Sequence, residues 1–347
     1  MIEKPDLTDA AITAALRDHY GLAVESLEFL QLGNDSYAWV YKVVAQDGKT
    51  FLLKVRKGAI NEASLSVPRF LKDHGIEQAV APLPTRAGTL WAAAEPFALI
   101  VYPFVEGRMG AQGGLSDAQW REMGVVMKQI HRLPLSADLR AQLRTETFSS
   151  KWAVVAHRIQ AEIMRTAYAG VSEAATAALW REKHAEIQRI LDRAIVLGDL
   201  LRGQPLDFVL CHADIHTHNV LVDETGGLFI VDWDETLLAP KERDLMFIGD
   251  GLADYSERDR RTDWFYRGYG KTNVNPTASV YYRYAWVVDE FGSYGEQILL
   301  TPDVGEETKK TAVQYFRDLF APGDVVDKAY QSEADLPSEF LMTPKET

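Results

Sequence analysis

The stretch CHADIHTHNVLVDETGGLFIVDWDETL, residues 211–237, decides the fold. It combines three histidines, one cysteine and several carboxylates with short apolar runs. Buried segments rarely carry so many ionisable groups unless those groups are paired or functional. Three kinds of chemistry use these residue types: a zinc site, a phosphatase with an aspartate nucleophile, and the catalytic loop of a kinase.

A zinc site would use His212, Asp214, His216 and His218, which alternate and would share one face of a strand. Structural zinc sites, however, usually take their ligands from separate segments, such as Cys-x-x-Cys pairs. The sequence has a single cysteine, Cys211, and no second ligand pair elsewhere. This spacing disfavours zinc.

A phosphatase would use Asp232 as its nucleophile, because the apolar run LFIV leads into Asp-x-Asp-x-Thr as in haloacid-dehalogenase-like enzymes. The segment GDGLAD, residues 249–254, imitates the later metal motif of those enzymes. The two motifs should lie on different strands of a parallel sheet, and each parallel crossover needs about a dozen residues or more. The interval between Asp232 and Gly249 is too short for several crossovers.

A kinase loop uses the same residues at the right distances. His212, Asp214 and Asn219 fit the pattern His-x-Asp-x-x-x-x-Asn. Residues 220–231 predict two short strands about a Gly-Gly turn, which deliver Asp232. We expect Asp214 to be the catalytic base that orients an acceptor hydroxyl, and Asn219 and Asp232 to supply hard oxygen ligands to Mg²⁺ on ATP.

A kinase also needs a lysine that holds the nucleotide phosphates. Residues 26–55 are rich in aromatic and branched side chains, with a hairpin turn at 46–49, and they predict an antiparallel sheet. Lys54 lies in the strand after this hairpin and is the predicted phosphate clamp. Glu62, in the helix predicted over 61–74, is the residue expected to pair with Lys54.

The segment FALIVYPFV, residues 97–105, predicts the strand and hinge that meet adenine. Pro103 has a carbonyl but no N–H and suits an acceptor for the adenine amino group. The Val105 N–H can donate to the ring. The alternative is a plain buried strand followed by a turn.

The rest of the chain is mainly helical. Ser116 and Gln119 form a capping box that opens a helix ending at Pro134. Further helical patterns cover 151–165, 172–203 and much of 257–320. The prediction is an α+β, bilobal, protein-kinase-like fold with a nucleotide-binding lobe and hinge, a catalytic and substrate-binding lobe, and a loose tail, at 1–107, 108–335 and 336–347 respectively.

Composition limits the partners. The 347 residues carry a net charge of −13, which argues against nucleic acid and anionic membranes and suits a cationic small molecule. The single cysteine fits a reducing compartment. The N-terminus has no signal-peptide pattern, and no run approaches the ~20 apolar residues of a membrane span. We expect a cytoplasmic protein, and the sequence does not decide between monomer and dimer.

With these residues in place, the sequence resembles the aminoglycoside phosphotransferase and choline kinase-like family. CHADIHTHNVL with IVDWDE is that family's form of the loop, with Asp-Trp-Asp after the second strand. LAPKERDLMFIG, residues 238–249, resembles the branch that acts on spectinomycin. The segment QLGNDSYAW, residues 31–39, departs from the Gly-rich loop of protein kinases and offers Ser36 as a phosphate-side residue.

The resemblance implies an ATP- and Mg²⁺-dependent O-phosphotransferase that modifies a cationic aminocyclitol antibiotic, spectinomycin first, and confers resistance. A pocket for such a substrate should offer carboxylates, and the candidates are Asp234, Glu235, Asp289 and Glu290. Two alternatives stay open: a kinase for another hydroxylated metabolite (choline, a sugar or an amino acid), and a silent nucleotide-binding module.

Overall fold

The computed structural model describes residues 4–31, 37–248 and 258–340. Ser36, which we expected at the phosphates, lies outside the described residues. The chain divides into two compact units, each built from several segments. The first unit contains residues 1–144, 210–238 and 259–271, and the second contains 145–209, 239–258 and 272–347. The boundary predicted at residue 107 falls inside the first unit, so the lobe limits remain a prediction.

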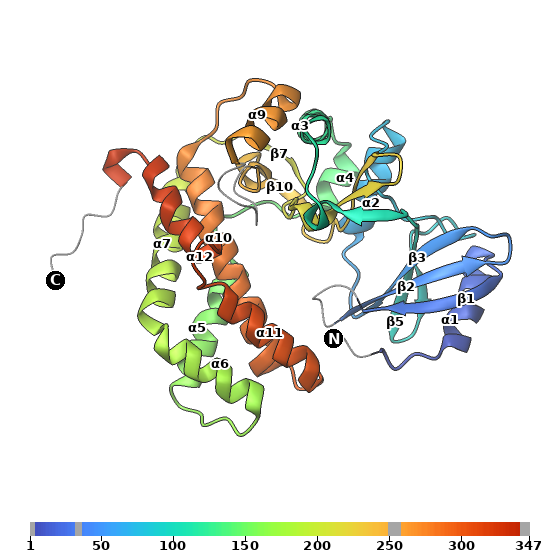
Figure 1. Cartoon of the computed structure of the whole chain (residues 1–347), viewed down its shortest axis with the longest axis horizontal. Helices are drawn as coiled ribbons and strands as arrows, with labels where there is room; N and C mark the ends of the chain where they lie inside the picture. Colours follow the sequence, from blue (N-terminus) through green and yellow to red (C-terminus); the bar gives the residue numbers. More distant parts are fainter. Residues whose placement is uncertain (1–3, 32–36, 249–257, 341–347) are drawn as a thin grey trace. The chain divides into compact units, whose positions relative to one another are not determined.

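The first unit begins with a five-stranded antiparallel sheet in the order β1-β2-β3-β5-β4 (Figure 1). Its strands are β1 (Val24–Leu30), β2 (Ala38–Ala45), β3 (Thr50–Lys57), β4 (Ala92–Ala94) and β5 (Phe97–Pro103). The predicted hairpin joins β2 to β3: Gly48 adopts φ 80°, and the Ala45 N–H donates to the Lys49 carbonyl at 2.9 Å. A positive φ costs glycine little, which explains its place in this turn.

Helix α1 (Asp9–Ala15) continues as a π-helical turn over Leu16–Tyr20 and covers one face of the sheet. Thr8 caps it, since its hydroxyl accepts from the Ala11 N–H. A helix this short is marginal by itself in water. Ile12 and Leu16 are fully buried against side chains of the sheet, and this packing stabilises the helix.

Helix α2 (Glu62–Asp73) follows β3 and is capped by Asn61, whose side chain accepts from the Ala63 N–H. After β5, residues 104–106 lead into a second, three-stranded sheet in the order β6-β8-β9. Its strands are β6 (Gly107–Met109), β8 (Val220–Asp223) and β9 (Leu228–Ile230). Gly107 lies so close to β8 that a Cβ there would stand 2.1 Å from the Val222 carbonyl oxygen. Only glycine allows this strand pairing.

The first unit also holds several helices. A two-stranded sheet is formed by two strands at which the chain passes between the units. The helices are α3 (Asp117–Arg132), α4 (Ala137–Gln142) and α9 (Arg258–Tyr269). The two strands are β7 (Phe208–Cys211) and β10 (Leu237–Pro240). The predicted capping box at the start of α3 is present, with Ser116 and Gln119 exchanging hydrogen bonds.

The second unit is helical. Its elements are α5 (Lys151–Ile163), α6 (Val171–Glu182), α7 (His184–Arg202), α8 (Glu242–Leu245), α10 (Pro276–Gly295), α11 (Glu306–Asp318) and α12 (Val325–Ser332). Helix α10 packs against α5, α7 and α12 (Figure 1). Trp180, Phe291 and Phe316 are fully buried, and the rings of Trp180 and Phe316 stack with centroids 5.3 Å apart.

Two details of the second unit differ from the sequence expectations. The helix predicted over 172–203 is broken at Lys183, which adopts φ −90° and ψ 6° and separates α6 from α7. No glycine or proline marks this break. Part of the predicted loose tail is anchored, because Leu336 is buried and the Phe340 carbonyl accepts from Arg193 at 2.7 Å. Among the described residues, no helix combines the length and apolarity needed to cross a membrane.

Candidate active site

The backbone is strained at two residues of the site, one before Asp214 and one at Asp232. Ala213 adopts φ 72° and Asp232 adopts φ 62°, both in the left-handed region that side chains other than glycine rarely occupy. Such conformations cost about 1–3 kcal/mol each and tend to cluster at functional sites. They stand next to the predicted base and at the predicted metal ligand.

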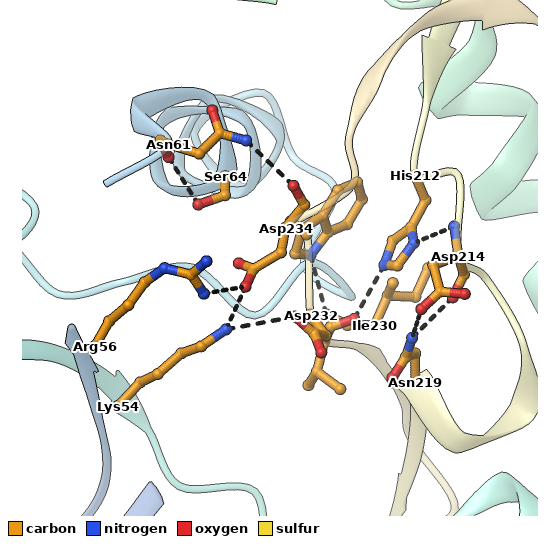
Figure 2. Close-up of polar contacts among 12 residues, drawn as sticks. Lys54, Arg56, Asn61, Ser64, His212, Asp214, Asn219, Ile230, Asp232 and Asp234 are labelled. Carbon is orange, nitrogen blue, oxygen red and sulfur yellow. Dashed lines mark hydrogen bonds and ion pairs between the residues drawn. The ribbon is translucent and has the colours of Figure 1, made fainter. Parts of the chain in front are cut away.

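Asn219 orients Asp214 directly (Figure 2). Its side-chain amide donates to the Asp214 carboxylate at 3.0 Å and to the Asp214 carbonyl at 2.8 Å. The Asn219 backbone is fixed as well, because its carbonyl accepts from the Val231 N–H at 3.0 Å. The amide nitrogen therefore points to the base, and Oδ1 points elsewhere.

His212 holds the same loop through two hydrogen bonds to the backbone. It is fully buried, its Nδ1 accepts from the Asp214 N–H at 3.2 Å, and its Nε2 donates to the Val231 carbonyl at 3.0 Å. This pattern requires the neutral tautomer with the proton on Nε2. The ring packs against Trp233 with centroids 4.6 Å apart. His212 thus joins the base to the strand that delivers Asp232, and it is not placed to share a metal with its neighbours.

The hairpin of β8 and β9 brings Asp232 to this loop, as predicted from the Gly-Gly turn. Its turn is held by Asp223, whose carboxylate accepts from the Thr225 N–H, the Thr225 hydroxyl and the Gly227 N–H at 2.7–2.9 Å. The strands pair in register from Val220 opposite Ile230. The spacing between Asn219 and Asp232 is therefore set by a fixed piece of sheet.

Lys54 reaches this group from β3. Its Nζ lies 2.7 Å from Asp234 Oδ2 and 3.5 Å from Asp232 Oδ1 (Figure 2). Arg56, two residues further along the strand, lies 3.1 Å from the same Asp234 oxygen. The Asp234 carbonyl accepts from the Asn61 side chain at 3.1 Å. Strand β3, the start of α2 and the segment after β9 thus meet at Asp234.

The charges of this cluster are interdependent. Burial disfavours the charged form of Lys54, but Asp232 and Asp234 outweigh burial and raise its pKa, so it is a cation at neutral pH. Burial likewise favours neutral Asp234, but Lys54 and Arg56 hold its pKa below the ordinary value. Lys54 favours ionised Asp232 too, yet desolvation and the nearby carboxylates of Asp234 and Asp214 raise the pKa of Asp232.

These groups fit a divalent cation. The Asp232 carboxylate and the Asn219 amide oxygen are hard ligands of the kind that Mg²⁺ prefers. Within the part of the chain that the structure describes, no donor reaches Asn219 Oδ1, and the crowding of negative charge raises the pKa of Asp232. A bound cation would satisfy the amide oxygen and relieve the repulsion between the carboxylates.

Two predicted contacts have other partners. Glu62 does not pair with Lys54, because its carboxylate accepts from the Trp91 indole N–H at 3.0 Å while Lys54 is neutralised by Asp234 and Asp232. Glu235, expected at the substrate, forms an ion pair with Arg144 at 2.9 Å. Asp234 itself faces the two cations of β3. Glu62 is thus a structural residue of α2 in this conformation, and its role toward ATP is not supported by its contacts.

The predicted hinge lies at the end of β5. Pro103 is the last residue of that strand and pairs with Phe51 of β3. Val105 lies in the connection to β6, and its N–H has no hydrogen-bond partner among the described residues. This leaves the donor available, and the contacts of both residues with adenine stay a prediction.

Asp289 and Glu290 belong to α10 in the second unit, and their role as substrate ligands also stays a prediction. The Ser150 hydroxyl donates to Asp289 at 2.5 Å. The Trp286 indole N–H donates to Glu290 at 3.0 Å. These hydrogen bonds orient both carboxylates within their own unit.

Sequence reasoning missed two residues of the site. Arg56 shares the face of β3 with Lys54, and the two-residue period of a strand could have identified it. His216 was considered only as a zinc ligand, but its Nε2 lies 3.4 Å from Asp214 Oδ1. No pattern in the sequence indicates that contact.

Comparison with known proteins decides the family. The model of the phosphotransferase enzyme family matches residues 28–273. The chain belongs to this family. Its fold is similar to that of spectinomycin phosphotransferase APH(9)-Ia in complex with ADP and spectinomycin, at 32% identity and a TM-score of 0.85, over 96% of this chain and 100% of that one. The AMP-bound complex of APH(9)-Ia has a TM-score of 0.80 at 32% identity, over 94% of this chain and 99% of that one.

A curated relative, Protein StrN of Streptomyces griseus, is 27% identical over 241 residues, which cover 66% of this chain and 71% of StrN. The family match and the structural likeness confirm the predicted α+β, kinase-like fold. They also confirm that the protein is an enzyme, a phosphotransferase with an alcohol group as acceptor.

Proposed function

We propose that this phosphotransferase moves the γ-phosphoryl group of ATP to a hydroxyl of spectinomycin or a closely similar cationic aminocyclitol, and that this modification gives resistance. The observation that carries the proposal is the arrangement of Asp214, Asn219, Asp232 and Lys54. Support for the substrate comes from the likeness to spectinomycin phosphotransferase over nearly the whole chain.

We assign each residue a role. Asp214, held by Asn219 and His212, accepts the proton of the acceptor hydroxyl. Lys54 holds the nucleotide phosphates, Pro103 and Val105 bind adenine, and Asn219 and Asp232 would hold Mg²⁺. When bound, the metal supplies positive charge that offsets charge building up on the transferred phosphoryl group. Catalysis then consists of alignment and charge stabilisation.

The assignment of residues that bind the acceptor rests on charge. The protein carries a net charge of −13, and a cationic acceptor is attracted to a negatively charged protein. We assign Asp289 and Glu290 as its carboxylate ligands. Asp234 and Glu235, which face Lys54 and Arg144, are weaker candidates because their charges are already matched.

The test is mass spectrometry of spectinomycin incubated with the protein, ATP and Mg²⁺, beside an Asp214→Asn control. We expect a gain of about 80 Da with the wild type and a rate lowered by about 10²- to 10⁴-fold with the variant. ATP consumption with choline, a sugar or an amino acid, but none with spectinomycin, would move the protein to another acceptor. ATP binding without turnover on any acceptor would make it a silent nucleotide-binding module.

A further inference from the structure

Strand β3 presents two cations on one face. Lys54 and Arg56 are two residues apart, and alternate side chains of a strand point the same way. The residues directly opposite Arg56 on the neighbouring strands are Ala38 of β2 and Ala98 of β5. Both are small residues, and the Arg56 side chain extends from this end of the strand to Asp234.

Both cations converge on a single anionic oxygen. Asp234 Oδ2 lies 2.7 Å from Lys54 Nζ and 3.1 Å from an Arg56 terminal nitrogen (Figure 2). Lys54 is only 16% exposed and Arg56 27% exposed, so their charges are less screened than those of surface pairs. The pair is therefore a formed anion-binding site, occupied by a carboxylate of the chain itself.

We propose that Arg56 is a second cationic ligand of the ATP triphosphate, and that Asp234 occupies Lys54 and Arg56 until the nucleotide takes its place. This inference rests on the proposed use of ATP. A guanidinium presents parallel N–H groups that match phosphate oxygens, whereas an ammonium acts as a point charge. Lys54 and Arg56 together offer two positive charges to successive phosphates.

The alternative ligand for this pair is the acceptor, and charge argues against it. The acceptor proposed above is cationic and is repelled by a guanidinium next to an ammonium. A triphosphate is the polyanion of the reaction, and it can compete with one carboxylate for both cations. The role of Arg56 should therefore appear in nucleotide binding and depend on the number of phosphates.

The experiment is titration calorimetry of ATP, ADP and AMP, with Mg²⁺ held constant, on wild type, Arg56→Gln and Arg56→Lys. Lys57→Gln is the matched control, because Lys57 is the next residue of β3, is exposed and loses the same charge. We expect Arg56→Gln to weaken ATP binding by about 10- to 100-fold and AMP binding by less than about twofold. Arg56→Lys should recover part of the loss, and Lys57→Gln should bind all three nucleotides like the wild type.

Two results would overturn the inference: an unchanged ATP affinity in Arg56→Gln, or an equal loss for ATP and AMP, which indicates a structural role. The stoichiometry of each titration reports the fraction of protein that is folded. If Arg56→Gln folds poorly, Arg56→Lys gives the same comparison, namely whether ATP affinity falls more than AMP affinity. Failure of the proposed function is seen separately: a wrong acceptor appears as unmodified spectinomycin in the mass spectrometry, and a protein that does not use ATP appears as a wild type that does not bind ATP.

Discussion

The Asn219 side-chain amide donates to the carboxylate and to the carbonyl of Asp214, at 3.0 Å and 2.8 Å. One residue thus orients the proposed base with its nitrogen and offers its oxygen to the proposed metal. The two functions are coupled geometrically, because rotating the amide to improve one contact would break the other. A change at Asn219 should therefore affect metal dependence and catalysis together.

Replacing Asn219 by alanine removes both contacts. We expect the Mg²⁺ concentration for half-maximal activity to rise by about 10-fold or more, and kcat at saturating Mg²⁺ to fall as well, because Asp214 loses its orienting donor. The measurement is phosphoryl transfer over a Mg²⁺ titration. A variant with the wild-type Mg²⁺ dependence would show that Asn219 is not a metal ligand. ATP binding in EDTA serves as the control and should change little.

Replacing His212 by phenylalanine keeps the ring next to Trp233 but removes the acceptor for Asp214 and the donor to Val231. Each orphaned buried backbone group costs about 1–3 kcal/mol. We therefore expect a lower midpoint of thermal unfolding and a kcat lowered by about 10-fold or more, with ATP affinity nearly unchanged. Unfolding by circular dichroism and steady-state kinetics check this.

The matched control is His218→Phe, the same change at an exposed position of the same loop. It should leave the unfolding midpoint close to that of the wild type. If both variants lose stability equally, the buried hydrogen bonds of His212 do not explain the effect.

Substitutions at Glu62 and at Asp234 should affect ATP affinity differently, because only Asp234 is paired with Lys54. Because Glu62 bonds to Trp91, Glu62→Gln should change ATP affinity by less than about threefold. Because Asp234 neutralises Lys54, Asp234→Asn should tighten ATP binding by about three- to tenfold, as an internal competitor is weakened. Both are measured by calorimetry in EDTA, which removes divalent metal from the comparison. A tenfold loss of ATP affinity in Glu62→Gln would instead support the Glu62–Lys54 ion pair predicted from the sequence.

The turn that delivers Asp232 predicts a pH dependence. The Thr225 hydroxyl, the Gly227 N–H and the Thr225 N–H hold the pKa of Asp223 below its usual value of 3.8. Since the pKa is lower in the folded state, the ionised carboxylate stabilises the fold above pH 3.8 and this contribution is lost as the pH falls through the folded-state pKa.

We therefore expect Asp223→Asn to lower the midpoint of thermal unfolding at pH 7, with the difference from wild type shrinking as the pH drops below 3.8. Thermal unfolding of both proteins between pH 7 and pH 3 measures it. A difference that stays constant over this range would show that the charge of Asp223 contributes nothing to the turn.

Most of the catalytic loop could be predicted from the sequence because its geometry is local. Asp214, Asn219 and Asp232 are joined by one short hairpin, and the Gly-Gly turn between its strands indicates how far apart they lie. The caps at Thr8 and Ser116 were predictable for the same reason, since a cap bonds to residues three positions away. The break at Lys183 was not, because no local residue type marks it.

By itself, the sequence determined the residue types of the site, their spacing and the family to which the spacing belongs. Only the tertiary structure decided which charges meet: Arg56 and Asp234 are 178 positions apart, and Glu62 turned to Trp91 instead of Lys54. The physical reason is that hydrogen-bonded turns and strand alternation act over a few residues, whereas an ion pair depends on where packing places separate segments. Lys54 can pair with whichever carboxylate packing places within reach, and here that carboxylate is Asp234.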